Sequence, residues 1–328
     1  MKPLRSLSIV IPTHNRADVL GRCLGALCRQ EALPADAEII VVDDGSEDET
    51  RAAVAAGANG APVPIHYLWQ AASGPAAARN RGIRAASGHI VLFLGDDIIA
   101  GPRLVSEHLS SHTAFPDVMI GVLGFVTWSD RVPVSPYMRW LESSGEQFAY
   151  GTLDDRSWVD PSRYLYTSNL SLKRRAVAES GEWFDERFRH ALLEDIDLGR
   201  RLASHGFTLY YNRAAGARHE HAIELRHYAR RIERSSEYWV LLEKKRNDAV
   251  PGAEKVPMPA RRNYVAYAGF LLRVSAEVIG NWPFWWVARF CEHRRVAPTA
   301  FRRAHHFWAQ RGLLRLEARK VAKLVGTA

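Results

Sequence analysis

Short apolar runs alternate with helix-like segments over the first 120 residues, and this alternation constrains the fold more than any other sequence feature. Each run is apolar at consecutive positions, as in a strand that is buried on both faces. Strands that are separated by helices join through right-handed crossovers into a parallel sheet. The sequence therefore predicts an α/β fold with a mostly parallel central sheet. The expected strands are Leu7–Ile11, Glu38–Val42, Ile65–Trp69 and Ile90–Leu94, with a helix from about residue 16 to 30 after the first.

The remainder of the chain is less regular. Residues 115–190 are rich in aromatic and turn-forming residues, and the pattern then predicts a helix over 184–201 and a short strand over Phe207–Tyr211. Beyond residue 222 the chain reads as helical, with a proline-rich break at 250–259. We therefore expect an α/β domain over 1–221 and a helical extension over 222–328.

The composition is that of an ordinary globular protein, with 47% apolar and 24% charged residues. The net charge of +8 is uneven: 222–328 carries about +12, and 1–221 about −4. The three cysteines (Cys23, Cys28 and Cys291) do not form a disulfide framework, so we expect free thiols in a reducing compartment. No signal peptide and no run of about 18 apolar residues is present, which predicts a cytoplasmic protein.

Small polar residues follow three of the four expected strands. They are Pro-Thr-His-Asn at 12–15, Asp-Asp-Gly-Ser at 43–46 and Gly-Asp-Asp at 95–97, and a Ser-Gly-Pro loop at 73–75 follows the remaining strand. Ligands of open parallel sheets bind at the carboxyl ends of the strands. These loops therefore predict a ligand site at one edge of the sheet. A dinucleotide site would need a Gly-rich turn after the first strand, and that turn is missing.

Acidic pairs and histidines are the candidate chemical groups. A strand-end aspartate can accept from a nucleoside or hold a divalent cation, although it can also simply cap the next helix. Glu194 and Asp195 lie in an apolar context that favours a raised pKa and a general-base role, but acids early in a helix also complement its dipole. His219 and His221 alternate, which suits a metal as well as a polar surface.

Eight short segments occur in a fixed order between residues 8 and 219: SIVIPTHNR at 8–16, VVDDGS at 41–46, GPAAARN at 74–80, LFLGDD at 92–97, SNLSLKR at 168–174, FDERF at 184–188, Glu194-Asp195 and His219. In this order and spacing they resemble glycosyltransferase family 2, over roughly residues 5–221. The resemblance implies a GT-A fold with inverting sugar transfer from a nucleoside-diphosphate donor, a UDP-sugar before the dTDP or GDP forms. It also implies transfer to a hydroxyl of a glycan or lipid-linked glycan in cell-envelope, polysaccharide or glycoconjugate synthesis.

The resemblance also implies roles for individual residues. Asp195 matches the catalytic base, and Glu194 would orient the base or the acceptor. Asp97 matches the last acid of the family's D-x-D motif and would bind Mn²⁺ or Mg²⁺, with His219 as a further ligand. Gly95 replaces the first acid of that motif. The implied nucleotide-binding residues are Pro12, Thr13, Asn15, Asp44, Gly74, Arg79, Asn80 and Asp96.

Residues 222–328 lie outside the resemblance. They contain an apolar stretch at 264–279, aromatic residues at 281–286 and a basic segment at 291–303. Basic residues beside aromatic ones suit peripheral contact with the inner face of an anionic membrane, although packing on the catalytic domain or homodimerisation also explains them. No nucleic-acid-reading module is visible. The alternatives to a transferase are a degenerate binding scaffold and a sugar-phosphate nucleotidyltransferase.

Overall fold

The computed structural model describes residues 6–147, 149–249, 277–289 and 298–325. They divide into two compact units, the first from 1–133 and 144–221 and the second from 134–143 and 222–328. The segment 134–143 belongs with the C-terminal helices, a feature that the expected boundary at 221 did not include. A catalytic role for 1–221 and a separate role for 222–328 stay predictions.

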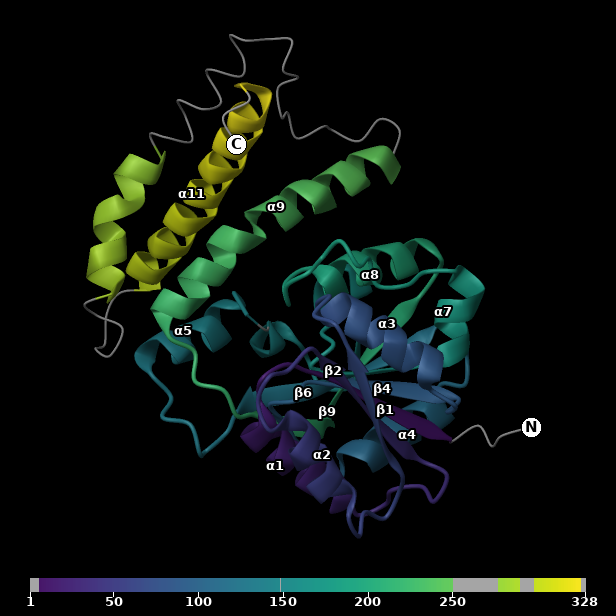
Figure 1. The fold of residues 1–328 in the computed structure, drawn as a ribbon. Coiled ribbons are helices and arrows are strands. Elements are labelled where there is room, and N and C mark those ends of the chain that lie inside the picture. Colours follow the sequence, from purple (N-terminus) through teal and green to yellow (C-terminus); the bar gives the residue numbers. More distant parts are fainter. Residues whose placement is uncertain (1–5, 148, 250–276, 290–297, 326–328) are drawn as a thin grey trace. The chain divides into compact units, whose positions relative to one another are not determined.

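The first unit is built on one nine-stranded sheet with helices on both faces (Figure 1). The strand order is β3-β2-β1-β4-β8-β6-β9-β5, and β7 pairs with β9. The strands are β1 (Leu7–Thr13), β2 (Glu38–Asp44), β3 (Ile65–Gln70), β4 (Ile90–Leu94), β5 (Ile98–Ala100), β6 (Ile120–Trp128), β7 (Ser157–Val159), β8 (Asn169–Lys173) and β9 (Thr208–His219).

Helices follow the strands as the alternation predicts. Helix α3 lies on one face of the sheet and α1 and α2 on the other (Figure 1). The helices of this unit are α1 (Ala17–Cys28), α2 (Thr50–Ala58), α3 (Pro75–Ala85), α4 (Leu104–Ala114), α6 (Pro161–Tyr164), α7 (Arg174–Ser180) and α8 (Glu194–Ser204), with a 3₁₀ turn η1 (Tyr150–Thr152).

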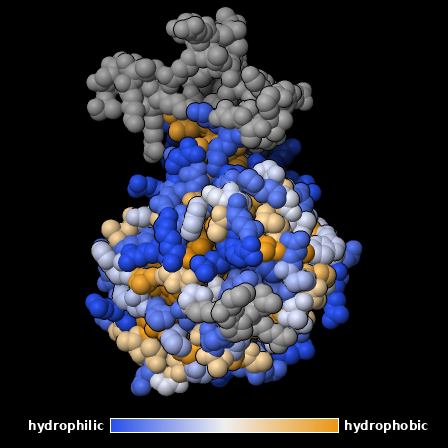
Figure 2. Space-filling view, turned by 90° about the vertical axis from the view of Figure 1, so that its right-hand side faces the viewer, coloured by the Kyte–Doolittle hydropathy of each residue, from blue (hydrophilic) through white to orange (hydrophobic). Residues whose placement is uncertain are grey.

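The parallel part of the sheet is confirmed. β1 pairs in parallel with β2 and β4, and β2 pairs in parallel with β3. Ile9, Val10 and Ile11 are completely buried, as the apolar run requires. On the face of the molecule in Figure 2, apolar residues lie in small groups among hydrophilic ones, which fits strands enclosed by helices. The carboxyl ends of these parallel strands therefore meet at one edge.

The rest of the sheet contains antiparallel pairs, although β6 and β9 pair in parallel. β8 pairs antiparallel with β4, so the residues before β8 lie beside those after β4. The register between β6 and β9 shifts after Gly124, where the Asn169 amide donates to the carbonyls of Ala215 and Phe125 at 2.8 and 3.2 Å. This amide thus satisfies backbone groups at an irregularity of the ladder.

Two expectations about local structure are wrong. The predicted helix over 184–201 begins only at Glu194, because Leu193 has a left-handed conformation (φ 73°) and Phe184 and Glu186 form hydrogen bonds with Asn80 of α3. The predicted strand Phe207–Tyr211 is longer: β9 runs to His219. His219 is therefore the last residue of the strand and does not follow it.

The second unit consists of α9 (Leu225–Ala249), a helix over 277–289, α11 (Pro298–Val325) and most of α5 (Pro136–Ser144). Its small core packs Ala229, Phe307 and Trp308 against Val278 and Trp285. The Tyr137 hydroxyl lies 2.6 Å from His305 Nε2, which fastens α5 to α11. The proline-rich break at 250–259, most of the apolar stretch at 264–279 and most of the basic segment at 291–303 lie outside the described residues.

Within the described ranges, no helix combines the length and apolar character that crossing a membrane requires. Cys23 and Cys28 are free thiols, in agreement with the sequence, and Cys291 lies outside the described residues.

Candidate active site

The two aspartates after β2 have different surroundings. Asp43 is buried and accepts from the Ser46 amide (2.8 Å) and the Tyr67 hydroxyl (2.6 Å), so it shapes the turn. Burial and this contact with Asp43 raise the pKa of Tyr67 to about 12. Asp44 instead accepts from the Gln70 side chain and from the backbone amides of the loop after β3. Asp44 therefore fixes the loop that leads into α3.

Gly74 of that loop has a conformation and a packing environment that only glycine fits. Its amide donates to Asp44 Oδ2 at 2.8 Å, next to the Ser73 amide, which donates to Oδ1 at the same distance. Its φ of +96° suits glycine, and a Cβ here would lie 2.6 Å from the carbonyl oxygen of Arg189. The close approach of two backbone segments therefore requires glycine at this position.

The loop after β1 packs against the loop after β2. Asn15 has a φ of +52°, and its amide donates to the Ser46 hydroxyl at 2.9 Å. Its side-chain oxygen accepts from the Glu47 amide at 2.8 Å. Pro12 is half-buried near the end of β1, whereas Asn15 is exposed. These contacts place both loops at the carboxyl edge of the sheet.

Asp96 and Asp97 form the acidic centre of this edge. Thr13 Oγ1 donates to Asp96 Oδ2 at 2.8 Å. The Arg16 guanidinium contacts both acids through one nitrogen, at 3.2 Å from Asp96 Oδ1 and in a shorter contact with Asp97 Oδ2. His219 Nε2 lies 3.2 Å from the same Asp97 oxygen. Thr13 and His219 are the last residues of β1 and β9, and Arg16 lies in the loop between β1 and α1.

The pKa values of the two acids diverge. Burial and the neighbouring Asp97 charge raise the pKa of Asp96 to about 6, against the opposite effect of Arg16. Burial also acts to raise the pKa of Asp97, but His219 and Arg16 outweigh it and hold this pKa far below its usual value. Asp97 is therefore the acid that stays ionised and can bind a cation.

Strand register brings His219 to this acid. β5 pairs antiparallel with β9 so that Ile98, the residue after Asp97, faces His219. The Trp128 ring stacks on the imidazole with a centroid distance of 5.4 Å. The Glu220 amide also donates to the Asp97 carbonyl at 2.7 Å. Asp97 and His219, which the resemblance implies as metal ligands, are therefore in contact.

A second acidic centre lies at the start of α8. Arg79 donates to Glu194 Oε1 at 2.8 Å, and both side chains are more than nine-tenths buried. Arg79 Nε and Glu194 Oε2 have no hydrogen-bond partner among the described residues. Burial, followed by the charge of Glu194, raises the pKa of Asp195 to about 7, although Arg79 acts in the opposite direction. Asp195 is thus poised to accept a proton near neutral pH.

The two acidic centres share one edge of the sheet. The Gly95 amide donates to the Ser168 carbonyl at 3.3 Å, which joins the loop of Asp96 and Asp97 to the residues before β8. The adjacent Thr167 amide contributes a hydrogen bond to Asp195. A continuous backbone segment therefore links the acids after β4 with the acid of α8.

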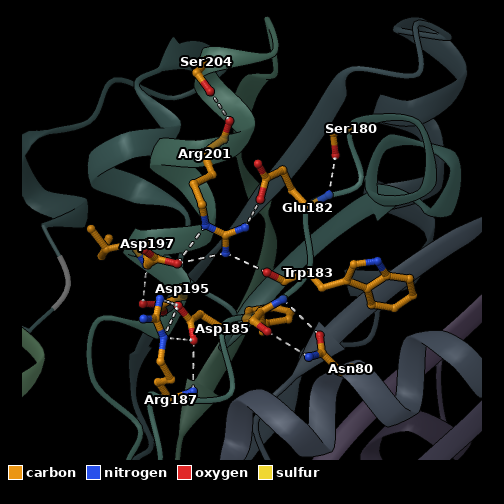
Figure 3. Close-up of polar contacts among 12 residues, drawn as sticks. Asn80, Ser180, Glu182, Trp183, Asp185, Arg187, Asp195, Asp197, Arg201 and Ser204 are labelled. Carbon is orange, nitrogen blue, oxygen red and sulfur yellow. Dashed lines mark hydrogen bonds and ion pairs between the residues drawn. The ribbon is translucent and has the colours of Figure 1, made fainter. Parts of the chain in front are cut away.

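Asn80 of α3 contacts the segment that precedes this second acidic centre. Its amide nitrogen donates to the Phe184 carbonyl at 2.9 Å, and its oxygen accepts from the Phe184 amide at 3.0 Å (Figure 3). The same nitrogen donates to Glu186 at 2.9 Å. Asn80 is 1% exposed. Asn80 thus anchors the segment that leads to α8, and its amide groups are engaged there.

Asp197 is also a structural residue. Arg201 donates to Asp197 Oδ2 at 2.9 Å and to the Trp183 carbonyl at 2.6 Å, and it contacts Glu182 (Figure 3). These contacts tie the segment before α8 to the helix itself. Of the three acids at 194–197, Asp195 is therefore the one whose carboxylate pairs with no basic side chain in the described part of the chain.

Sequence reasoning did not assign a role to Arg16, Trp128 or Glu220. Arg16 directly follows the polar residues 12–15, and the available signal was a basic residue after one strand when two other strands are followed by paired aspartates. Glu220 accepts from Arg22 of α1 at 2.6 Å and so fastens the end of β9. No local pattern could indicate this contact, because the two residues are far apart in the chain.

The donor set suits a divalent cation in part. No group of three or more His, Cys, Asp or Glu ligands occurs in the part of the chain that the structure describes. Asp97 and His219 nevertheless offer one carboxylate and one imidazole side by side. Mg²⁺ in nucleotide sites is commonly held by one or two carboxylates, with phosphate oxygens and water completing its shell. The residues therefore fit a metal that arrives with a diphosphate.

Comparisons with known proteins show which protein family this chain resembles. The model of the family described as "Glycosyl transferase family 2" matches residues 8–181. Validoxylamine A glucosyltransferase of Streptomyces hygroscopicus subsp. limoneus is 35% identical over 232 residues, which cover 63% of this chain and 50% of that protein. The chain thus spans about half the length of this curated relative.

Solved structures share the fold at low sequence identity. One is a mannosyltransferase from Pyrobaculum calidifontis in complex with GDP-Man and Mn²⁺, with a TM-score of 0.54, 19% identity and coverage of 73% of this chain and 63% of that one. Another is residues 1–349 of S. aureus TarS in complex with UDP, with a TM-score of 0.54, 15% identity and coverage of 96% and 91%. The predicted α/β fold of the GT-A type, with additional C-terminal helices, is confirmed. With a family model that matches just over half of its length, the chain belongs to glycosyl transferase family 2.

Proposed function

We propose that this chain transfers a sugar from a nucleoside-diphosphate donor to an acceptor hydroxyl, with inversion at the anomeric carbon. One observation carries the proposal: an ionised acid beside a histidine (Asp97 and His219) shares a sheet edge with an acid whose pKa is near 7 (Asp195). The first centre suits the diphosphate, and the second suits the acceptor. Family membership argues against the nucleotidyltransferase alternative.

The donor would occupy the loops after β1, β2 and β3. Three hydrogen bonds engage the Asp44 carboxylate, which leaves about one of its four acceptor positions for a base N–H. The base and ribose would lie beside Asp44, bordered by Pro12, Thr13 and Asn15. Gly74 would let the loop after β3 approach them. We propose that Asn80 positions α8 and does not contact the donor, because its amide is already engaged. A UDP-sugar remains the first choice, with dTDP and GDP forms to be tested.

The diphosphate leaving group gains negative charge as the sugar departs. Mn²⁺ or Mg²⁺, when bound, would stabilise that charge. Asp97 and His219 would hold the metal, and Asp96 would stay beside the ribose and sugar. This arrangement follows from the low pKa of Asp97, the higher pKa of Asp96 and the donor set at this edge.

Asp195 would remove the proton of the acceptor hydroxyl. Glu194 and Arg79 would orient the acceptor, since Glu194 Oε2 and Arg79 Nε lack partners among the described residues and are buried. Attack by this hydroxyl on the face opposite the leaving group gives single displacement. The acceptor that we propose is a glycan or lipid-linked glycan.

Release of the nucleoside diphosphate from a panel of UDP-, dTDP- and GDP-sugars, with Mn²⁺, tests this function. We expect slow release to water from one donor and its loss in Asp97→Asn. The matched control is Asp36→Asn, which removes an exposed carboxylate just before β2, at the opposite end of that strand from Asp43 and Asp44. No release from any donor, or equal release by Asp97→Asn, would favour the degenerate-scaffold alternative.

We also propose that the second unit contacts an anionic membrane surface. The helix over 277–289 exposes Ile279, Trp282 and Trp286 (73%, 55% and 59% exposed), which lie on one helical face at spacings of three and four. Its other face packs on α9 and α11 through Val278 and Trp285. The described residues that line the adjoining hollow include four arginines (Arg226, Arg230, Arg289 and Arg311) and no carboxylate. Aromatic side chains flanked by arginines suit an anionic interface.

A further inference from the structure

A single arginine neutralises the acidic centre at the end of β4. Arg16 lies immediately before α1, and one guanidinium nitrogen contacts both Asp96 and Asp97. The two acid side chains are only 9% and 11% exposed, whereas the Arg16 side chain is 37% exposed. Two adjacent buried carboxylates repel each other, so a cation at this place stabilises them. Arg16 supplies that cation from the solvent side.

The Arg16 contact uses the oxygen that a metal would need. Asp97 Oδ2 already contacts both Arg16 and His219. A divalent cation bound to this oxygen would lie within a few ångströms of the guanidinium, and the two positive charges would repel each other strongly in a buried setting. Arg16 and the metal therefore compete for the same carboxylate.

We propose that Arg16 is a positioning residue that holds Asp96 and Asp97 until a metal-bound nucleotide displaces its guanidinium. This inference rests on the proposed function. The diphosphate both supplies metal ligands and attracts the released guanidinium, because it carries several negative charges. Metal alone then binds weakly, metal together with nucleotide binds tightly, and the two affinities are coupled.

Mn²⁺ affinity tests the competition without any measurement of turnover. Free Mn²⁺ is titrated by electron paramagnetic resonance into the full chain, alone and with saturating UDP, dTDP or GDP. We expect Arg16→Gln to bind Mn²⁺ alone about tenfold more tightly than the wild type, or more, because a repelling charge is removed. The ratio of Mn²⁺ affinities with and without nucleotide should fall in the same variant.

Three further variants serve as controls. Arg16→Lys keeps the positive charge and should resemble the wild type, and Arg16→Met should repeat the effect of Arg16→Gln. Arg175→Gln removes an exposed arginine of α7 that pairs with Glu179, and it should leave Mn²⁺ affinity unchanged. The double variant Arg16→Gln, Asp97→Asn should lose the gained affinity if the metal binds at Asp97.

The outcomes separate this inference from the proposed function. Unchanged or weaker Mn²⁺ binding by folded Arg16→Gln and Arg16→Met would overturn the role of Arg16, even if the wild type binds nucleotide. Failure of the wild type to bind any nucleotide with Mn²⁺ would instead count against the proposed function. The comparison with Mn²⁺ alone would still decide whether Arg16 competes with a cation.

Discussion

At the scale of single residues, environment separates acids that look alike in the sequence. Asp195 and Asp197 lie two positions apart at the start of α8, yet Arg201 pairs with Asp197. Burial and the neighbouring Glu194 charge instead raise the pKa of Asp195 to about 7. A general base needs such a value near the working pH, and a structural carboxylate does not. Asp195 is therefore the base in our account.

Replacement of this base should abolish most of the transfer. We expect Asp195→Asn to lower turnover by about 10²-fold or more, a general-base magnitude, with donor affinity unchanged. Wild-type turnover should rise with pH through about 7, because only the ionised carboxylate accepts a proton. Steady-state rates from pH 5.5 to 8.5 check both points. Near-normal turnover in the variant would exclude Asp195 as the base.

The same substitution should increase stability above neutral pH. The folded-state pKa of Asp195, about 7, lies above the ordinary value of 3.8, so the folded protein binds more protons than the unfolded chain between these values. The contribution of this group to stability is therefore lost as pH rises from about 4 to about 7. At pH 8 we expect Asp195→Asn to gain roughly 1–2 kcal/mol in unfolding free energy.

Denaturant unfolding at pH 8 and pH 4.5 measures this gain. The gain should largely vanish at pH 4.5, and Asp36→Asn should show no such pH dependence. An Asp195→Asn variant that is less stable than the wild type at pH 8 would contradict the raised pKa.

Individual roles at the site were only partly predictable. The sequence indicated Asp97, His219, Glu194 and Asp195 by motif, and the structure brings the first two into contact. The sequence offered no means to predict that Asn80 contacts the segment before α8, or that Arg16 contacts Asp96 and Asp97. Those contacts join residues about 80 to 106 positions apart. Such contacts depend on the packed structure and leave no local pattern.

At the scale of elements, the parallel strands were predictable and the segment before α8 was not. Buried parallel strands leave continuous apolar runs, which is a local signal. Residues 184–193 were expected to be helical, but Asn80 binds the backbone of Phe184, and Arg201 binds the carbonyl of the preceding Trp183. Likewise, β9 extends past the expected strand because pairing with β5 and β6 continues to His219. Tertiary contacts therefore decided both elements.

The loop that begins α3 tests this dependence on tertiary contact. Gly74→Ala should cost about 1–3 kcal/mol in unfolding free energy and weaken nucleotide binding, because its Cβ would lie 2.6 Å from the Arg189 carbonyl oxygen. Gly60→Ala is the matched control: Gly60 also has a positive φ, of 74°, but its Cβ would meet no atom within 4 Å. Gly60→Ala should cost about 1 kcal/mol and leave binding intact. Calorimetry and denaturant unfolding measure both effects, and equal loss of binding in both variants would contradict the account.

At the scale of the whole molecule, the sequence gives the two parts of the chain opposite net charges. In our proposal the first unit binds an anionic donor through a few side chains at the sheet edge, whereas the second unit has arginines and exposed tryptophans around one helix. This difference motivates separate tests for the two units. The sequence identified the aromatic segment at 281–286, but it could not show which of its tryptophans are exposed.

Vesicle flotation tests the membrane proposal. The full chain should float with vesicles that contain anionic lipid, less so at high salt, and remain unbound with zwitterionic vesicles. The double variant Trp282→Ser, Trp286→Ser should lose most of this binding. Trp158→Ser removes a tryptophan of similar exposure (53%) from the first unit and should still float. Binding that survives the double variant would contradict the proposal, and a concentration-dependent dimer without flotation would favour homodimerisation.

The central claim is that the sheet edge around Asp44 and Asp97 binds a nucleoside diphosphate together with a divalent metal. Isothermal calorimetry of UDP, dTDP and GDP, each with Mn²⁺ and again with a chelator, tests it most directly. We expect one nucleotide to bind tightly with Mn²⁺ and at least about tenfold more weakly with the chelator or in Asp97→Asn. Binding of none of the three to the folded chain, or binding that neither the chelator nor Asp97→Asn weakens, would contradict the account.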